Sequence, residues 1–280
     1  MNKKLAKLKS LPVYILASIW AVITLYPILF TIFSSFKNND EIFSSSTSAL
    51  MLPTSLRFEN YVDAFTKANM LKCLFNSVVI SGFSTLLVLL LASMVSFVIA
   101  RLSYKINNII LIYFTLGVMI PIHTTLVPLL KIVNSLHGQN SYVMMVILYT
   151  AFNLPIAILL ITGHMKGITK SMDESAIIDG CGPIRLYGNI IMPLTMPALS
   201  TAGILTFLFV YNDLLFGVLF ISKKSMYTIT LGILTFVGSK VTEYGPIFAS
   251  IIISIIPMVI IYLMFQEKVE GGLAAGAVKG

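Results

Sequence analysis

The sequence predicts an all-α membrane protein with six transmembrane helices. Of its 280 residues, 57% are hydrophobic and only 11% are charged, whereas roughly a quarter of the residues of a soluble domain are charged. The chain contains six apolar stretches, and each reaches the length of about 20 residues that a helix needs to cross a bilayer. The predicted spans cover approximately residues 12–36, 74–100, 108–130, 141–163, 197–221 and 246–266.

Basic residues predict how these spans are oriented. They gather before the first span and in the very short loop after the second, and positively charged loops stay on the cytoplasmic side. Six spans then return the C-terminus to the same side. We therefore expect a cytoplasmic N-terminus over 1–11, a single transmembrane domain over 12–280 and a flexible cytoplasmic tail over 267–280. The basic residues concerned are Lys3, Lys4, Lys7, Lys9, Arg101 and Lys105.

Several classes of function are disfavoured by the sequence. The net charge of +8 does not form a basic stripe with interleaved aromatics, so we expect no nucleic-acid partner. There is no Gly-Lys dipeptide and hence no Walker A loop to hold ATP. His123, His137 and His164 are isolated, which disfavours a zinc protease and predicts no metal site. Cys73 and Cys181 fall on opposite sides of the membrane and should not pair. No catalytic residue is predicted, and the chain is not expected to be an enzyme.

The first span and the segment after it have distinct features. The basic start and apolar run resemble a signal peptide, but the run exceeds its usual length, so we expect a retained anchor. Pro27 predicts a kink within this span. Residues 37–72 form the longest outer segment, in which Ser44 to Ser48 indicate a loop and the stretch after Pro53 is more amphipathic.

Polar residues interrupt the third and fourth spans. The third contains Pro121-Ile122-His123-Thr124-Thr125 and the fourth contains Asn153-Leu154-Pro155. Polar groups at membrane depth usually face the bundle interior or a cavity. His123 is either a packing histidine or a substrate ligand, and Asn153 is a second candidate for a substrate pathway.

The fifth span contains Tyr211-Asn212-Asp213, and Asp213 is the one acidic residue within the predicted spans. A carboxylate is costly in a membrane and is a candidate functional group by default. Asp213, with Asn212 and Tyr211, is therefore assigned to the candidate substrate pathway. The alternative is that Asp213 holds a helix end or a partner protein by hydrogen bonds.

The polar loop over 164–196 predicts two short helical pieces joined by a glycine bend. Ser171 and Glu174 have the spacing of a capping box, which predicts a helix start at Ser171. Gly180, Gly182 and the following proline predict a stop and a restart. A small-residue face formed by Ser175, Ala176 and Gly180 would let another protein approach closely, as in groove docking.

This loop also carries a family resemblance. Glu174-Ser175-Ala176, Gly180, Ile190 and Pro193 resemble the "EAA" loop of ABC importer permeases, the coupling element that contacts the ATPase subunit. Two positions depart from the usual pattern, with serine for alanine and methionine for leucine. The ATPase-coupling residues implied by the resemblance are Glu174, Ser175, Ala176, Asp179, Gly180, Ile190 and Pro193.

The resemblance extends over most of the chain. Leu52-Pro53, Glu59-Asn60-Tyr61, Phe75-Asn76-Ser77 and the Tyr211-Asn212-Asp213 segment are similar to carbohydrate-type ABC permeases. His123 departs from the Pro-x-Gln common in that family. The terminus Gly276-Ala277-Val278-Lys279-Gly280 resembles that of maltose-type permeases, whose tail reaches into the ATPase dimer.

The resemblance implies an ABC type I importer permease fold in a bacterial cytoplasmic membrane. It implies that the chain forms half of a translocation pathway for a sugar or oligosaccharide. The implied partners are a homologous second permease, an ATPase dimer that binds ATP and Mg, an extracellular sugar-binding protein and membrane lipid. Two alternatives remain open: an ABC permease for another polar solute such as glycerol-phosphate, and a secondary transporter or channel that needs no ATPase.

Overall fold

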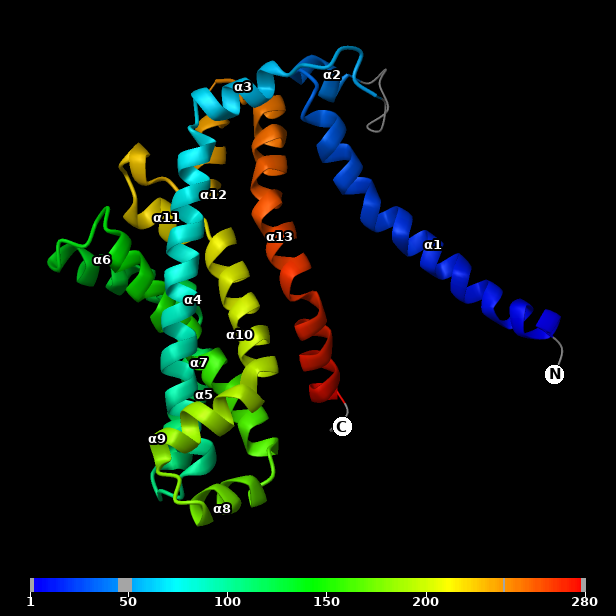
Figure 1. Ribbon diagram of the computed structural model, residues 1–280. Coiled ribbons are helices and arrows are strands. Elements are labelled where there is room, and N and C mark those ends of the chain that lie inside the picture. The colour runs from blue at the N-terminus through cyan, green and yellow to red at the C-terminus, as the bar shows by residue number, and fades with distance from the viewer. Residues whose placement is uncertain (1–2, 45–51, 239, 278–280) are drawn as a thin grey trace. The chain divides into compact units, whose positions relative to one another are not determined.

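The structure is a computed structural model that describes residues 3–44, 52–238 and 240–277, with side chains from residue 12 to residue 264 within those ranges. The described chain is built from helices joined by short loops (Figure 1). The α-helices are α1 (Lys3–Ser34), α2 (Asn39–Phe43), α3 (Glu59–Thr66), α4 (Met70–Arg101), α5 (Asn107–Met119), α6 (Leu126–Ser135), α7 (Tyr142–Gly167), α8 (Ser171–Ile178), α9 (Pro183–Arg185), α10 (Met192–Asn212), α11 (Leu215–Phe220), α12 (Ile229–Ile233) and α13 (Tyr244–Ala277). Shorter 3₁₀ or π segments cover Ile122–Thr125, Leu186–Ile191, Lys224–Met226 and Leu234–Phe236.

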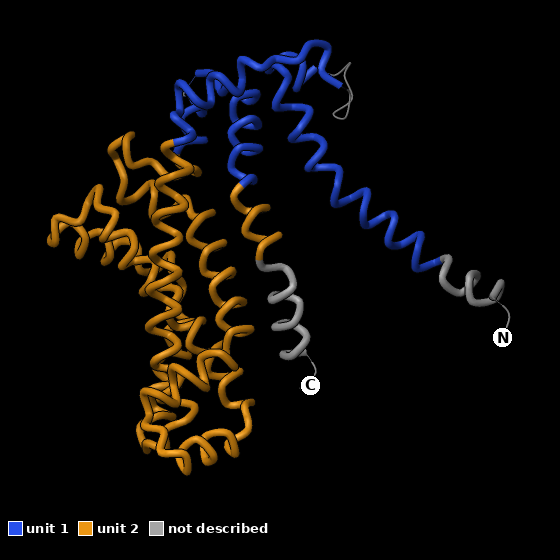
Figure 2. The backbone as a smooth tube through the Cα atoms, in the orientation of Figure 1, with its two compact units in different colours: residues 1–71, 232–256 blue, residues 72–231, 257–280 orange. Residues whose placement is uncertain are grey.

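The chain divides into two compact units (Figure 2). Unit 1 comprises Met1–Leu71 and Gly232–Ile256, and unit 2 comprises Lys72–Leu231 and Pro257–Gly280. The division reflects how the helices pack, and the single transmembrane domain over 12–280 stays a prediction.

In unit 1, hydrogen bonds hold the segment that follows α1 against α3. The buried Asn60 side chain donates from Nδ2 to the carbonyl oxygens of Ser35 at 2.8 Å and Lys37 at 2.9 Å. The Ser35 hydroxyl lies 2.8 Å from the Tyr61 hydroxyl. Gly245, at the start of α13, approaches so closely that a Cβ there would lie 2.5 Å from the Lys37 carbonyl oxygen. These contacts account for the polar residues that precede the second span.

Unit 2 is organised around α7, which packs against α5 and α10. One buried apolar cluster joins the ends of α4 and α7 to the loop that follows α7. A second joins α6, α7 and α11 at the other end of α7. The described chain contains no disulfide between Cys73 and Cys181.

The prediction of an all-α protein with six apolar stretches is confirmed for the described chain. Five helical stretches are long and apolar enough to cross a membrane, and a sixth stretch is a bent pair of helices. The five are Pro12–Ser34, Met70–Arg101, Tyr142–Gly167, Pro183–Asn212 and Tyr244–Met264.

The predicted third span over 108–130 is bent at the polar patch that interrupts it in the sequence. The helical segments Asn107–Met119 and Ile122–Ser135 meet at 88°. Ile120 and Pro121 are both extended, with ψ of 115° and 126°. A residue that precedes proline is disfavoured from the helical region, which explains why the helix ends here.

The predicted fifth span over 197–221 is shifted. The helical stretch begins at Pro183 and ends at Asn212. It ends there because Asp213 is extended, with φ −68° and ψ 133°. Asp213 therefore follows the helix and does not lie within it.

The predicted flexible tail over 267–280 is also corrected. Helix α13 continues to Ala277, in keeping with the high helix propensity of Leu and Ala in this segment. Residues 278–280, like part of the predicted loop from Ser44 to Ser48, lie outside the described residues.

Candidate functional site

Helix α8 and the turn after it form the centre of the loop between α7 and α10. The helix ends in a Schellman motif: the Cys181 amide donates to the Ala176 carbonyl at 2.9 Å, and the Gly180 amide donates to the Ile177 carbonyl at 3.0 Å. Gly180 has φ +76°, a conformation that glycine adopts without steric cost. The predicted turn at Gly180 is present in the structure.

The predicted capping box at the start of α8 is wrong. The residue at the N-cap is Lys170, whose backbone is helical, and it makes no side-chain cap. Ser171 is already inside the helix, whereas a capping serine needs an extended backbone. The Ser171 carbonyl instead accepts from the Ser175 hydroxyl at 2.9 Å. Glu174 is exposed in the first turn.

Arg101, which the sequence suggested only as a marker of orientation, anchors this loop. Its guanidinium donates to the carbonyl oxygens of Met165 at 3.1 Å, Ile168 at 2.8 Å and Thr169 at 3.3 Å. It also pairs with the Asp173 carboxylate at 2.6 Å. The side chain of Arg101 is 1% exposed and that of Asp173 is 13% exposed. The pair spans 72 positions of the sequence, so no local pattern could have found it.

The helical restart after Gly180 is present and longer than predicted. Gly182 is extended and Pro183 occupies the first turn of α9, the position where its missing N–H costs least. The chain then passes through a π segment into α10 without leaving the helical conformation. Within that segment, the Tyr187 hydroxyl lies 2.7 Å from the Ser93 hydroxyl of α4. This contact connects the restarted helix to α4, the span that ends at Arg101.

Most of the predicted coupling residues line one hollow of about 520 Å³. It lies between α8 and the start of α10, and its lining includes Ser175, Ala176, Asp179, Ile190 and Pro193. Ala176 is buried in the unit's own core, so the predicted small-residue face is corrected at that position.

The same loop exposes large apolar side chains. Ile178, the last residue of α8, is 85% exposed, and Ile184 in α9 is 87% exposed. Both lie beside the turn at Gly180. The two isoleucines thus give the loop an apolar surface that the described chain leaves uncovered.

Asp213 joins three elements of unit 2. Its carboxylate accepts from the Tyr149 hydroxyl of α7 at 2.8 Å and from the Phe216 amide of α11 at 2.9 Å. Its carbonyl accepts from the Thr230 hydroxyl at 2.8 Å. Asp213 thus fixes the break between α10 and α11. Tyr149 was not singled out by the sequence, and its hydroxyl connects the Asp213 carboxylate to α7.

The other candidates for a substrate pathway are dispersed. Asn153 is buried and donates to the Tyr149 carbonyl at 2.8 Å, so it connects to Asp213 through Tyr149. Tyr211 is buried against Phe207, and Asn212 is exposed and donates to its own helix. His123 is exposed in the 3₁₀ segment of the bent pair, so it is not a packing histidine within this chain.

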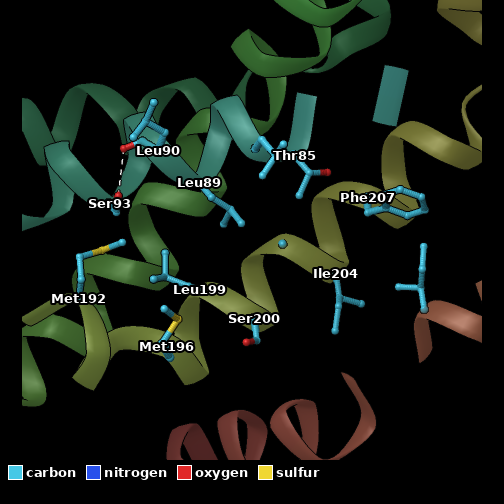
Figure 3. A pocket seen from close by; sticks show the side chains of 13 residues that line it. Thr85, Leu89, Leu90, Ser93, Met192, Met196, Leu199, Ser200, Ile204 and Phe207 are labelled. Carbon is cyan, nitrogen blue, oxygen red and sulfur yellow. Dashed lines mark hydrogen bonds between the residues drawn. The ribbon is translucent and has the colours of Figure 1, made fainter. Parts of the chain in front are cut away.

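An apolar groove of about 490 Å³ runs between α4 and α10. Figure 3 shows side chains from both helices converging on it, with Leu89, Leu199 and Phe207 among them. Its few polar groups include Ser93 and Ser200, and the Ser93 hydroxyl already donates to the Leu90 carbonyl. Thr85 also lines the groove, and the rest of the lining is apolar.

Unit 1 contains a charged pocket of about 390 Å³. Within it, the Lys67 ammonium lies 2.9 Å from the Asp63 carboxylate and 3.2 Å from the Glu243 carboxylate. Hydrogen bonds to Asp63 and then Glu243 raise the pKa of Lys67 above its usual value. All three side chains are at least 30% exposed, so these are surface pairs. Within the described residues, no group of His, Cys, Asp and Glu has the arrangement of a metal site.

These features define a multi-pass helical membrane protein with an exposed helix between two of its spans. The chain belongs to the family of binding-protein-dependent transport system inner membrane components, whose profile matches residues 92–273. The resemblance inferred from the loop is confirmed.

Relatives match the chain over nearly its whole length. It is 33% identical over 267 residues to a putative ABC transporter permease protein of Caldicellulosiruptor sp., with 95% of this chain and 96% of the relative covered. It is 31% identical to the multiple sugar-binding transport system permease protein MsmG of Streptococcus mutans, with 99% and 100% covered.

A solved structure has the same fold. A chain of a bacterial ABC transporter involved in the import of the acidic polysaccharide alginate matches with a TM-score of 0.80 at 16% identity, covering 95% of this chain and 98% of that one.

Proposed function

We propose that the chain is the permease subunit of an ATP-binding cassette importer and forms half of the path for a sugar or oligosaccharide delivered by an external binding protein. The family assignment supports import with a binding protein. Relatives named for multiple sugars and for starch degradation products, the latter from Thermoanaerobacterium thermosulfurigenes at 33% identity, support a carbohydrate. Another polar solute, such as glycerol-phosphate, is the alternative within this class.

The observation that carries the proposal is the exposed loop of α8 and α9. Ile178 and Ile184 are almost fully exposed on either side of the turn at Gly180, and leaving such side chains in water is unfavourable. We assign the covering partner as a separate ATPase dimer that binds ATP and Mg, because this chain has no Walker A loop. Glu174, Ser175, Asp179 and Gly180 would contribute to that contact.

A homologous second permease is the proposed partner within the membrane. None of the most apolar stretch of α1 is buried by its own chain, and the substrate candidates of this chain do not form a closed site. A pathway shared with a second permease explains why. Closure of the ATPase dimer would then move α8, and through it the spans, between inward-facing and outward-facing states.

We further propose that both termini and the α8 loop face the cytoplasm of a bacterial cell. The lysine-rich start supports this orientation. Cys181, partly exposed beside Gly180, is a native reporter. An impermeant thiol reagent should modify it in inverted vesicles, and modification of Cys181 in intact cells would overturn the orientation.

Reconstitution tests the function. The complex is extracted from its own membrane, its subunits are identified, and uptake of a panel of oligosaccharides and glycerol-phosphate into vesicles is measured with and without ATP. We expect an ATPase to remain bound through purification and uptake to need both ATP and the binding protein. Uptake by the purified chain alone would support a secondary transporter or channel instead.

A further inference from the structure

The buried pair of Arg101 and Asp173 is placed where the exposed loop meets the ends of two spans. Arg101 is the last residue of α4, and Asp173 lies in the first turn of α8. The guanidinium also binds the Met165 and Ile168 carbonyls at the end of α7. The Met165 carbonyl also accepts from the Ile168 amide at 3.2 Å in the C-cap of α7. Arg101 therefore adds a second donor to this C-cap and contacts α8 with the same guanidinium.

The charges also match the helix dipoles. The positive guanidinium lies at the C-terminal end of α7, and the negative carboxylate lies at the N-terminal end of α8, the arrangement that both dipoles favour. The two side chains are 1% and 13% exposed, so water and salt screen the pair far less than a surface pair.

The surrounding packing makes the connection rigid. Phe97 of α4, Met165 of α7 and Ala176 of α8 belong to one buried cluster. On the other side, the buried Asn107 side chain donates to the Val98 carbonyl at 3.0 Å and also to the Leu102 carbonyl, which fixes the end of α4. The end of α4, the end of α7 and α8 therefore form one body.

We propose that Arg101 is a positioning residue that transmits movement of α8 to the spans α4 and α7, with Asp173 as its partner. The inference rests on the proposed function for the meaning of that movement. A force applied to α8 reaches the membrane through this fork, because a planar guanidinium can bind the α7 carbonyls and the α8 carboxylate at once. Lysine carries the same charge but lacks the fork.

The first test measures ATP hydrolysed per solute accumulated, in vesicles with equal amounts of assembled complex. The variants are Arg101→Gln, Arg101→Lys and Asp173→Asn, and the control is Lys105→Gln, which removes a positive charge from an exposed position in the same loop. Loss of a charged hydrogen bond predicts a roughly tenfold rise in this ratio for Arg101→Gln and Asp173→Asn. Arg101→Lys should be intermediate, and Lys105→Gln should match the original chain. A purely structural role would lower the amount of complex but leave the ratio unchanged.

The second test does not depend on the ATPase. The rate at which a thiol reagent modifies Cys181 is measured in the full chain in membranes stripped of partner proteins. Cys181 packs against the buried cluster that α4, α7 and α8 share. Because loss of the Arg101–Asp173 pair should loosen this cluster, we expect roughly tenfold faster modification in Arg101→Gln and Asp173→Asn. An unchanged ratio in a complex whose uptake depends on ATP would overturn the inference, whatever the Cys181 rate. If ATPase coupling itself were wrong, the Cys181 rate would still rise while uptake would not depend on ATP.

Discussion

Single residues show what could be predicted from the sequence and what could not. The turn at Gly180 was predictable, because glycines followed by proline indicate a helix stop wherever they occur. The Arg101–Asp173 pair was not, because its partners are 72 positions apart. The capping box failed for a related reason: its spacing is present, but the helical backbone of Lys170 places Ser171 inside α8.

Asp213 provides a prediction at this scale. The carboxylate accepts from Tyr149 and from the Phe216 amide, and the oxygen of an asparagine could still accept both bonds. We expect Asp213→Asn to assemble normally and keep basal ATPase activity but to weaken transport, because the charge on the proposed pathway is lost. Asp213→Ala should also lose about 2 kcal/mol or more of stability, since hydrogen bonds to charged groups contribute roughly that much.

Uptake, basal ATPase activity and the amount of complex in the membrane check this prediction. Tyr149→Phe is the matched control, because it removes one donated hydrogen bond and leaves the charge in place. If Asp213→Asn itself removed the complex from the membrane, Asp213 would be a residue that holds the helix break and not part of the pathway.

At the scale of elements, composition located the spans and proline chemistry located their breaks. The bend of 88° before Ile122 follows from Pro121, and the sequence had already indicated an interruption there. The angle depends on packing against α7 and was not predictable. The start of the fifth span was misplaced because the π segment keeps the chain helical from Pro183, and periodicity cannot anticipate such a segment. Its end was misplaced because Asp213 is extended and ends the helix after Asn212.

Two serines test how the helices begin. Ser141 is the N-cap of α7, with an extended backbone and a hydroxyl that accepts from the Met144 amide at 3.3 Å. Ser171 makes no cap. We therefore expect Ser141→Ala to cost about 1 kcal/mol of stability and Ser171→Ala to stay within about 0.5 kcal/mol. Thermal unfolding of the detergent-solubilised chain checks both, and an equal loss in the two variants would restore the capping box.

At the scale of the whole molecule, the sequence predicted the fold class and the family but not the division into two units. That division depends on which helices bury one another, and hydropathy alone does not encode it. The exposed apolar surface of α1 and of the α8 loop shows why. The sequence shows that the residues of these surfaces are apolar. Whether they face lipid, the protein core or a partner depends on the assembly.

The most direct test of ATPase coupling is substitution at Gly180. A Cβ at this position meets no atom of the described chain within 4 Å, so a new side chain there acts mainly through a partner. Aspartate and asparagine both tolerate the φ of +76° and are similar in size. An unpaired charge buried in an interface is strongly unfavourable, whereas a neutral amide is much less so.

The measurement is ATP-dependent uptake in vesicles, with the amount of retained ATPase determined in the same samples. We predict that Gly180→Asp inserts at normal levels but abolishes uptake by releasing or uncoupling the ATPase, and that Gly180→Asn keeps a substantial part of it. Normal uptake by Gly180→Asp would contradict the assignment of this loop as the coupling element.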